Sequence, residues 1–167
     1  MRAWLPLTLF AFVACNAGLK DGYFVKDGVR YKVATLEGDW QKVDFSDNDL
    51  AWVRKDTAQV LAMNATCKDT GDPSLEVLTN HLLMGFTDKW LKERSLKPLD
   101  GRDALVSRYD AKLDGVEVEL QVAVMKKDDC VYDFSYIAPK GHFEEGEVAF
   151  DKLLGSFTTG ASGMANR

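Results

Sequence analysis

Two histidines occur in the chain, and imidazole is the side chain that most often serves as a general base in enzymes. His81 falls in a segment with a helical spacing of apolar residues, and His142 falls in a loop. Neither has a sequence neighbour that would orient it as a base, and the nucleophile motif Gly-x-Ser-x-Gly does not occur. We therefore expect both histidines to lie on the surface, and we expect the protein not to be an enzyme.

A group of acidic residues, Asp44, Asp47 and Asp49, has the oxygen-rich composition of a calcium loop. The register does not fit, because Trp52 stands at the sixth position counted from Asp47, where a calcium loop needs glycine. Aspartates also form turns by accepting hydrogen bonds from nearby backbone groups. We interpret the group as turn-forming and expect no metal site.

Glu117 and Glu119 alternate along an expected strand, which would place their carboxylates about 7 Å apart. Paired carboxylates in this distance range hydrolyse glycosides in other proteins. Arg108 and Lys112 fall on the strand expected beside this one, so opposite charges can neutralise one another across the sheet. We interpret the four residues as a charged, solvent-exposed surface and expect no catalytic residue there.

Cys67 and Cys130 fall at the end of one expected strand and at the start of another. In an exported protein such a pair can form a disulfide, because oxidising compartments preserve the bond. Two buried free thiols are the alternative that the sequence leaves open. A zinc site is disfavoured, because the chain lacks a Cys-x-x-Cys spacing with nearby histidines, and we expect no cofactor.

The third cysteine, Cys15, follows a segment with the plan of a signal peptide: a basic residue, Arg2, then a short apolar run and a small residue. The run is too short to cross a bilayer, which takes about 20 apolar residues. Phe12-Val13-Ala14-Cys15 resembles the bacterial lipobox. This resemblance implies that residues 1–14 are removed and that Cys15 carries a diacylglyceryl group, often with an amide-linked acyl chain such as palmitate. An ordinary secretory signal cleaved elsewhere is the alternative.

The residues after Cys15 define the expected location of the protein. In lipoproteins of bacteria with two membranes, Asp at the next position is associated with the inner membrane, so Asn16 implies the periplasmic face of the outer membrane. Residues 15–21 would form the lipidated cysteine and a short tether, whose six residues after Cys15 reach at most about 20 Å. Loss of Arg2 takes the formal net charge from −5 to −6, which disfavours nucleic acid as a partner.

Residues 22–157 predict a single α+β domain with an antiparallel sheet and two main helices. The strand at residues 116–124 alternates so regularly that we expect one of its faces in the core and the other in water. We expect residues 158–167 to be disordered. Strands are expected over residues 23–25, 29–33, 50–55, 59–66, 103–112, 116–124 and 130–138.

Two segments have helical periodicity. Asp72-Pro73 predicts a helix start, and the apolar residues that follow predict a helix of about 18 residues. The second helix is expected from Glu144 to Leu154. The apolar residues of the first helix are Leu75, Leu78, Leu82, Phe86 and Trp90.

A second apolar stripe, formed by Val77, Met84 and Leu91, recurs every seven residues on the first expected helix. One sheet cannot cover both stripes. Either a loop or the other helix covers the second stripe, or the stripe is a surface that contacts a partner protein.

The order of elements resembles the PsbP-like fold family, which includes extrinsic photosystem subunits and small exported bacterial lipoproteins. The resemblance rests on the Trp after the opening hairpin, the central helix, the Asp100-Gly101-Arg102 turn before a three-strand meander, and a closing helix with Phe150, Leu153, Leu154 and Phe157. It implies a non-enzymatic accessory or assembly role and assigns no functional residue.

The sequence therefore favours a membrane-anchored lipoprotein of the cell envelope that interacts with another envelope protein. The alternative is a module that binds a small apolar or lipidic ligand. A buried apolar cavity of about 300 Å³ or more would favour the alternative, whereas a close-packed core would disfavour it. The aromatic residues that would line such a cavity are Trp52, Tyr109, Tyr132, Phe134 and Tyr136.

Overall fold

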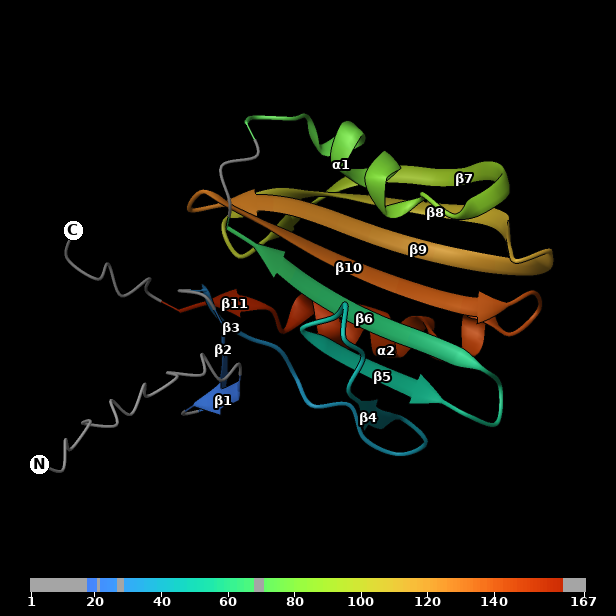
Figure 1. Cartoon of the computed structure of the whole chain (residues 1–167), viewed down its shortest axis with the longest axis horizontal. Coiled ribbons are helices and arrows are strands. Elements are labelled where there is room, and N and C mark those ends of the chain that lie inside the picture. The colour runs from blue at the N-terminus through green and yellow to red at the C-terminus, as the bar shows by residue number, and fades with distance from the viewer. Residues whose placement is uncertain (1–17, 21, 27–28, 68–70, 161–167) are drawn as a thin grey trace, which may run out of the picture.

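Two antiparallel sheets and two helices form the fold, and this confirms the expected α+β class (Figure 1). The computed structural model describes residues 18–20, 22–26, 29–67 and 71–160. The seven-stranded sheet has the order β4-β5-β6-β10-β9-β8-β7, and the four-stranded sheet has the order β1-β2-β3-β11. The strands of the large sheet are β4 (Gln41–Val43), β5 (Leu50–Arg54), β6 (Gln59–Thr66), β7 (Phe86–Leu99), β8 (Arg102–Leu113), β9 (Val116–Lys127) and β10 (Cys130–Pro139). Those of the small sheet are β1 (Gly18–Lys20), β2 (Tyr23–Lys26), β3 (Val29–Lys32) and β11 (Thr158–Thr159).

Tight hairpins connect the four longest strands into a meander from β7 to β10. Each connection has two residues between the paired strand ends, and both residues have positive φ: Asp100-Gly101, Asp114-Gly115 and Asp128-Asp129. Two-residue turns of this kind match the twist of the strands that they join, and Asp and Gly are the residues that tolerate them. The strands expected over residues 103–112 and 116–124 are present, and the Asp114-Gly115 turn joins them.

The first helix is much shorter than predicted. Helix α1 spans Leu75–Leu82, and its N-cap is Ser74, whose hydroxyl accepts a hydrogen bond from the Val77 amide, so the predicted cap at Asp72-Pro73 is wrong. The chain turns at Gly85, which has a φ of +93°, and then enters β7. A positive φ suits glycine and ends a helix, so the second half of the predicted helix is a strand.

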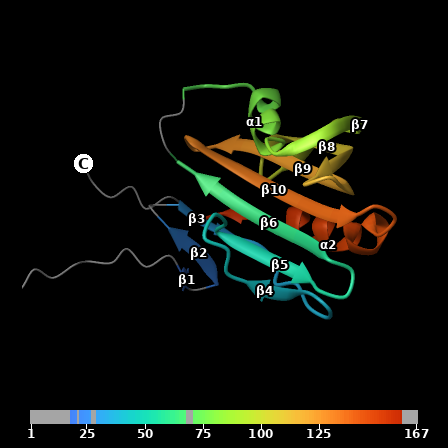
Figure 2. The ribbon, with the colours of Figure 1, turned by 45° about the vertical axis from the view of Figure 1, so that its right-hand side comes forward.

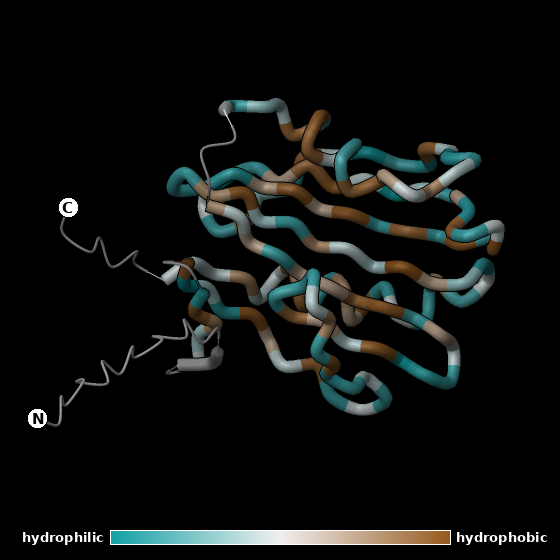
Figure 3. Tube along the Cα trace, in the orientation of Figure 1, coloured by the Kyte–Doolittle hydropathy of each residue, from teal (hydrophilic) through white to brown (hydrophobic). Residues whose placement is uncertain are grey.

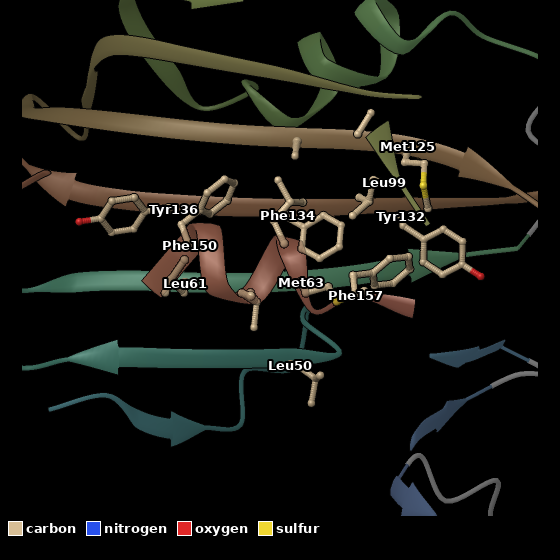
Figure 4. Close-up of a cluster of buried hydrophobic side chains, with 14 of the residues drawn as sticks. Leu50, Leu61, Met63, Leu99, Met125, Tyr132, Phe134, Tyr136, Phe150 and Phe157 are labelled. Atoms are coloured by element: carbon tan, nitrogen blue, oxygen red, sulfur yellow. The ribbon is translucent and has the colours of Figure 1, made fainter. Parts of the chain in front are cut away.

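The two helices cover opposite faces of the large sheet (Figure 2). Helix α2 (Phe143–Gly155) lies over β10 and β6, close to its predicted bounds. The core on its side is rich in aromatic rings, and Phe157 packs against Tyr132 and Phe134 (Figure 4). Gly146 permits the close approach of α2, because a Cβ at this position would overlap the side chains of Tyr136 and Gln59.

Strand β9 is buried on both faces, so the prediction of one wet face is wrong. Val118, Leu120 and Val122 pack beneath α1, while Ala123 and Met125 face the core under α2. The alternating pattern therefore separates two cores rather than a core from water.

The small sheet contains segments that the sequence assigned to the two ends of the chain. Strand β1 begins at Gly18, inside the predicted tether, and pairs with β2. Thr158 and Thr159 pair with β3, where a disordered tail was expected. Asp100 explains this second pairing, because its carboxylate accepts hydrogen bonds from the Thr159 amide and hydroxyl at 2.8 and 2.7 Å. Gly160 of the predicted tail also donates its amide to the carbonyl oxygen of Arg30 at 2.8 Å, and the remaining residues of the predicted tether and tail lie outside the described residues.

Candidate functional site

The structure describes two of the three cysteines, Cys67 and Cys130. Cys67 and Cys130 form a disulfide that joins the end of β6 to the start of β10. The register explains this pairing, because Thr66 lies opposite Val131 and places the two cysteines at facing positions. The predicted lipidation site, Cys15, lies outside the described residues. No helix among the described residues is long and apolar enough to span a membrane.

The histidines and the acidic loop residues do not form a shared site. His81 is exposed on α1, and the Nδ1 of His142 lies 2.8 Å from Glu145 Oε1 in an exposed pair. Asp49 is buried, where it accepts a hydrogen bond from the Ala65 amide and pairs with Lys26 at 2.7 Å. Among the described residues, no group of three or more histidine, cysteine or carboxylate side chains is arranged to hold a metal ion.

Glu119, which was expected to be solvent-exposed, is only 9% exposed. Its Oε2 accepts hydrogen bonds from Arg108 at 3.0 Å and Lys92 at 3.1 Å, and the Arg108 guanidinium also stacks over the Phe143 ring at 3.7 Å. Burial alone would raise the pKa of Glu119, but the hydrogen bonds from these two cations outweigh it and lower the pKa. A carboxylate held ionised in this way is a poor proton donor. Glu117, by contrast, is exposed and pairs with Lys140.

The aromatic residues of the ligand-binding alternative do not line a cavity. Trp52, Tyr132, Phe134 and Tyr136 are buried in one packed cluster with α2, and Tyr109 packs separately beneath α1. A small apolar hollow of about 160 Å³ lies between α1 and the sheet, lined by Thr66, Leu78, His81, Leu82, Val124, Val131 and Asp133. A larger, open groove of about 630 Å³ lies beside the disulfide, but charged side chains such as Arg102, Lys126 and Asp72 line it.

Several hydrophobic residues of the segment that runs from α1 into β7 (Figure 3) have exposed side chains. Trp90 and Met84 are both 72% exposed, and Val77 and Leu91 are 44% and 42% exposed. We call these four residues the α1–β7 surface. Scattered apolar residues are normal on a protein surface, but a tryptophan with this exposure, on a segment with three other exposed apolar side chains, is unusual.

The α1–β7 surface wraps around the outer strand of the sheet instead of forming one helical stripe. Leu91 pairs with Tyr109, which faces α1, whereas Trp90 pairs with Asp110, which faces the other side. Val77 lies on α1 and Met84 lies in the turn that follows α1. The predicted seven-residue stripe on one helix is therefore wrong, although all three of its members are exposed.

Polar contacts hold α1 and β7 together beneath these side chains. Arg94 of β7 donates hydrogen bonds to Glu76 on α1 at 3.2 Å and to the hydroxyl of Tyr109 at 2.9 Å. Lys89 donates to the carbonyl oxygen of Leu83, at the end of α1, at 3.3 Å. The surface is thus built on elements that are fixed relative to each other.

Strand β7 is an edge strand that is poorly suited to pairing with another strand. Its register with β8 shifts between Thr87 and Trp90 and again between Leu91 and Glu93. Four basic residues and Pro98 also lie on it: Lys89, Lys92, Arg94 and Lys97. Bulges, lysines and proline are the features by which natural sheets avoid pairing edge to edge. A partner at this edge would therefore contact side chains rather than extend the sheet.

Trp90 is the residue of this surface that sequence reasoning assigned to the wrong environment. It was expected in the apolar stripe that the first helix buries, yet it is 72% exposed on β7. Gly85 was the signal that could have corrected the assignment, because glycine inside a helical pattern often marks the end of a helix.

No protein-family model matches the chain, and no curated protein matches its sequence. Solved structures do match its fold. LpqN of Mycobacterium tuberculosis, which is involved in cell envelope biogenesis, has a TM-score of 0.56 at 13% identity, over 80% of this chain and 86% of that chain. Cyanobacterial PsbP, or CyanoP, of Synechocystis sp. PCC 6803 has a TM-score of 0.52 at 15% identity, over 92% of this chain and 99% of that chain. A Bacteroides thetaiotaomicron protein has a TM-score of 0.57 at 12% identity, over 87% of this chain and 50% of that chain. The chain therefore has a PsbP-like fold.

Proposed function

We propose that the protein is a lipid-anchored, non-enzymatic accessory protein of the cell envelope that binds a protein partner through the α1–β7 surface. The observation that carries the proposal is the exposure of Trp90 and Met84, each 72%, on the same segment as the exposed Val77 and Leu91. Tryptophan is enriched among the residues that dominate binding energy at protein interfaces.

The location in the envelope rests on the sequence and gains support from one similar structure. The lipobox-like residues end at Cys15, and a disulfide joins Cys67 to Cys130, which suits an oxidising compartment outside the cytoplasm. LpqN, whose fold is similar, is involved in cell envelope biogenesis. The periplasmic face of the outer membrane is the location implied by Asn16.

The charges around the surface indicate the chemistry of the partner. Four basic residues and two acidic ones, Asp88 and Glu93, lie on β7, whereas the whole chain has a formal net charge of −5. Exposed Lys89 and Lys97 flank the apolar side chains of this strand. We infer a protein partner with an apolar depression bordered by carboxylates, because opposite charges at the rim of an interface direct association.

Photo-cross-linking in native membranes followed by affinity measurement tests the proposal. A photoreactive residue at position 84 should capture one partner, which mass spectrometry identifies and which is then purified. Trp90→Ala should weaken the affinity for that partner at least tenfold, in the range of a truncated hot-spot residue. Because Trp90 is exposed, the truncation leaves no cavity in the core.

Val148→Ala is the control, since Val148 is 76% exposed on α2, an element that contributes no residue to the α1–β7 surface. This variant should bind as the unmodified protein does. Equal affinities of Trp90→Ala and the unmodified protein, or cross-links to the same partner from position 148, would contradict the proposed surface.

A further inference from the structure

The small sheet lies at one end of the elongated molecule and closes the core on its inner face (Figure 1). Phe24, Val29 and Tyr31 point inward and are buried, and the Tyr31 ring contacts those of Tyr132 and Phe157. The outward face of β2 and β3 must then carry the alternating residues, because successive side chains of a strand point to opposite sides.

That outward face is basic and aromatic. Arg30 lies opposite Val25 in the register, and Lys32 follows two positions later on the same side, with both cations exposed. The guanidinium of Arg30 stacks over the ring of Tyr23, with its central carbon 4.3 Å from the ring centroid. The four residues Tyr23, Val25, Arg30 and Lys32 are called the small-sheet face below.

The charge of this end is opposite in sign to that of the whole chain. Between positions 18 and 32 the sequence has four basic residues and two acidic ones, Asp21 and Asp27, and the chain has a formal net charge of −5. Asp49 pairs with Lys26 of this segment, so the excess positive charge comes from the remaining cations. Without a local excess of positive charge, an acidic domain near an anionic membrane is repelled from it.

The anchor of the proposed function would bring this same end to the membrane. Strand β1 begins at Gly18, so only Asn16 and Ala17 separate it from Cys15. Two residues span at most about 7 Å. A lipid on Cys15 would therefore hold the small sheet at the bilayer surface.

We propose that the small-sheet face binds the headgroups of anionic phospholipids and thereby sets the orientation of the domain on its membrane. The proposal rests on the lipid anchor of the proposed function. A cation close to an anionic membrane contributes about 1 kcal/mol, so Arg30 and Lys32 can bias the orientation appreciably. Tyr23 adds an amphipathic ring of the kind that settles at the headgroup level.

Hydrogen exchange of the full lipoprotein on vesicles tests this orientation. The protein is reconstituted into vesicles of phosphatidylcholine alone or of phosphatidylcholine with 30% phosphatidylglycerol, and exchange is followed for amides of residues 22–32. We expect slower exchange on the anionic vesicles, and we expect 0.5 M NaCl to abolish the difference by screening. Each cation removed should lower the equilibrium constant for contact between the small-sheet face and the membrane roughly fivefold.

Arg30→Glu with Lys32→Glu should abolish the difference between the two vesicle types. Lys55→Glu with Lys140→Glu makes the same change in net charge on the β5–β6 turn and the loop before α2, and it should preserve the difference. Arg30→Gln with Lys32→Gln provides a second variant should the charge reversal impair folding, and it should reduce the difference.

Failure of the lipid anchor and failure of the small-sheet proposal give different results in this experiment. Failure of the unmodified protein to float with neutral vesicles would refute the lipid anchor and so the proposed function. Flotation with both vesicle types but equal exchange on them, or protection of the α1–β7 surface instead, would overturn the small-sheet proposal while leaving the anchor intact.

Discussion

Buried carboxylates tie distant parts of this chain together, and their environments shift their pKa values in opposite directions. Asp133 of β10 lies beneath the surface and accepts a hydrogen bond from the Asn64 side-chain amide at 3.1 Å. Burial and the nearby Asp49 raise its pKa to about 6, although the bond from Asn64 opposes this shift. Burial alone would raise the pKa of Asp100 too, but hydrogen bonds from Lys127 and Thr159 outweigh it and lower the pKa to about 2.

Replacing Asp133 should stabilise the protein at neutral pH. The native state retains a proton on Asp133 that the unfolded chain releases, so the free energy of unfolding falls as pH rises from about 4 to about 6. Asp133→Asn removes this loss and should raise the free energy of unfolding at pH 7.5 by on the order of 1–3 kcal/mol, with little effect at pH 4. Urea unfolding at pH 7.5 and at pH 4 measures this change in the free energy of unfolding. Exposed Asp103→Asn is the control, and an unchanged pH dependence in Asp133→Asn would refute the assignment.

Replacing Asp100 should destabilise the attachment of β11. A lowered pKa means that the stabilisation is present above about pH 4 and is lost as pH falls toward 2. Asp100→Asn keeps a residue that tolerates the local φ of 47° but removes the charge, and it should cost about 1 kcal/mol at pH 7. Asp114→Asn is matched, because Asp114 has a φ of 51° at the same position of the next hairpin. Equal thermal midpoints for the two variants would contradict this role of Asp100.

Among the secondary-structure elements, the positions of hairpin turns could be predicted from the sequence better than the length of the first helix. The Asp114-Gly115 turn and the α2 helix follow from local signals, since turn residues and apolar spacing act over a few positions. Phe86 and Trp90 continue the apolar spacing of a helix, yet pairing with β8 and the turn at Gly85 place them in strand β7. Strand pairing is a long-range contact, which local periodicity does not contain.

For the candidate site too, local signals in the sequence could be predicted, whereas features that depend on long-range contacts could not. The seven-residue spacing of Val77, Met84 and Leu91 identified them as apolar residues that one sheet cannot cover, and their side chains are exposed. Trp90 could not be assigned, because its exposure depends on which side of an edge strand it occupies. The burial of Glu119 was also missed, since α2 and Arg108 approach it from segments far away in the sequence.

The packing of α2 provides a prediction at this scale. Gly146→Ala places a methyl group against the hydroxyl of Tyr136 and should destabilise the protein by about 1–3 kcal/mol through overpacking. Gly155→Ala in the same helix meets nothing within 4 Å and should be neutral or slightly stabilising. Thermal unfolding of the two variants measures the contrast, and equal midpoints would show that α2 can shift away from the sheet without cost.

At the scale of the whole molecule, the two proposed contacts lie on different parts of the fold. The small sheet, which begins at Gly18, occupies one end, while the turn from α1 into β7 lies toward the other end (Figure 1). An anchor at the first end would leave the α1–β7 surface accessible to a partner. Both proposals therefore depend on whether the mature protein begins at Cys15 and carries lipid there.

Mass spectrometry of the N-terminal peptide, taken from protein extracted from its native membranes, tests that claim most directly. We expect a peptide that begins at Cys15 and carries the mass of a diacylglyceryl group, with or without an amide-linked acyl chain, and we expect Cys15→Ala to abolish this mass and release the protein from the membrane fraction. A peptide that begins at another residue, or one that begins at Cys15 without lipid, would refute the lipid anchor.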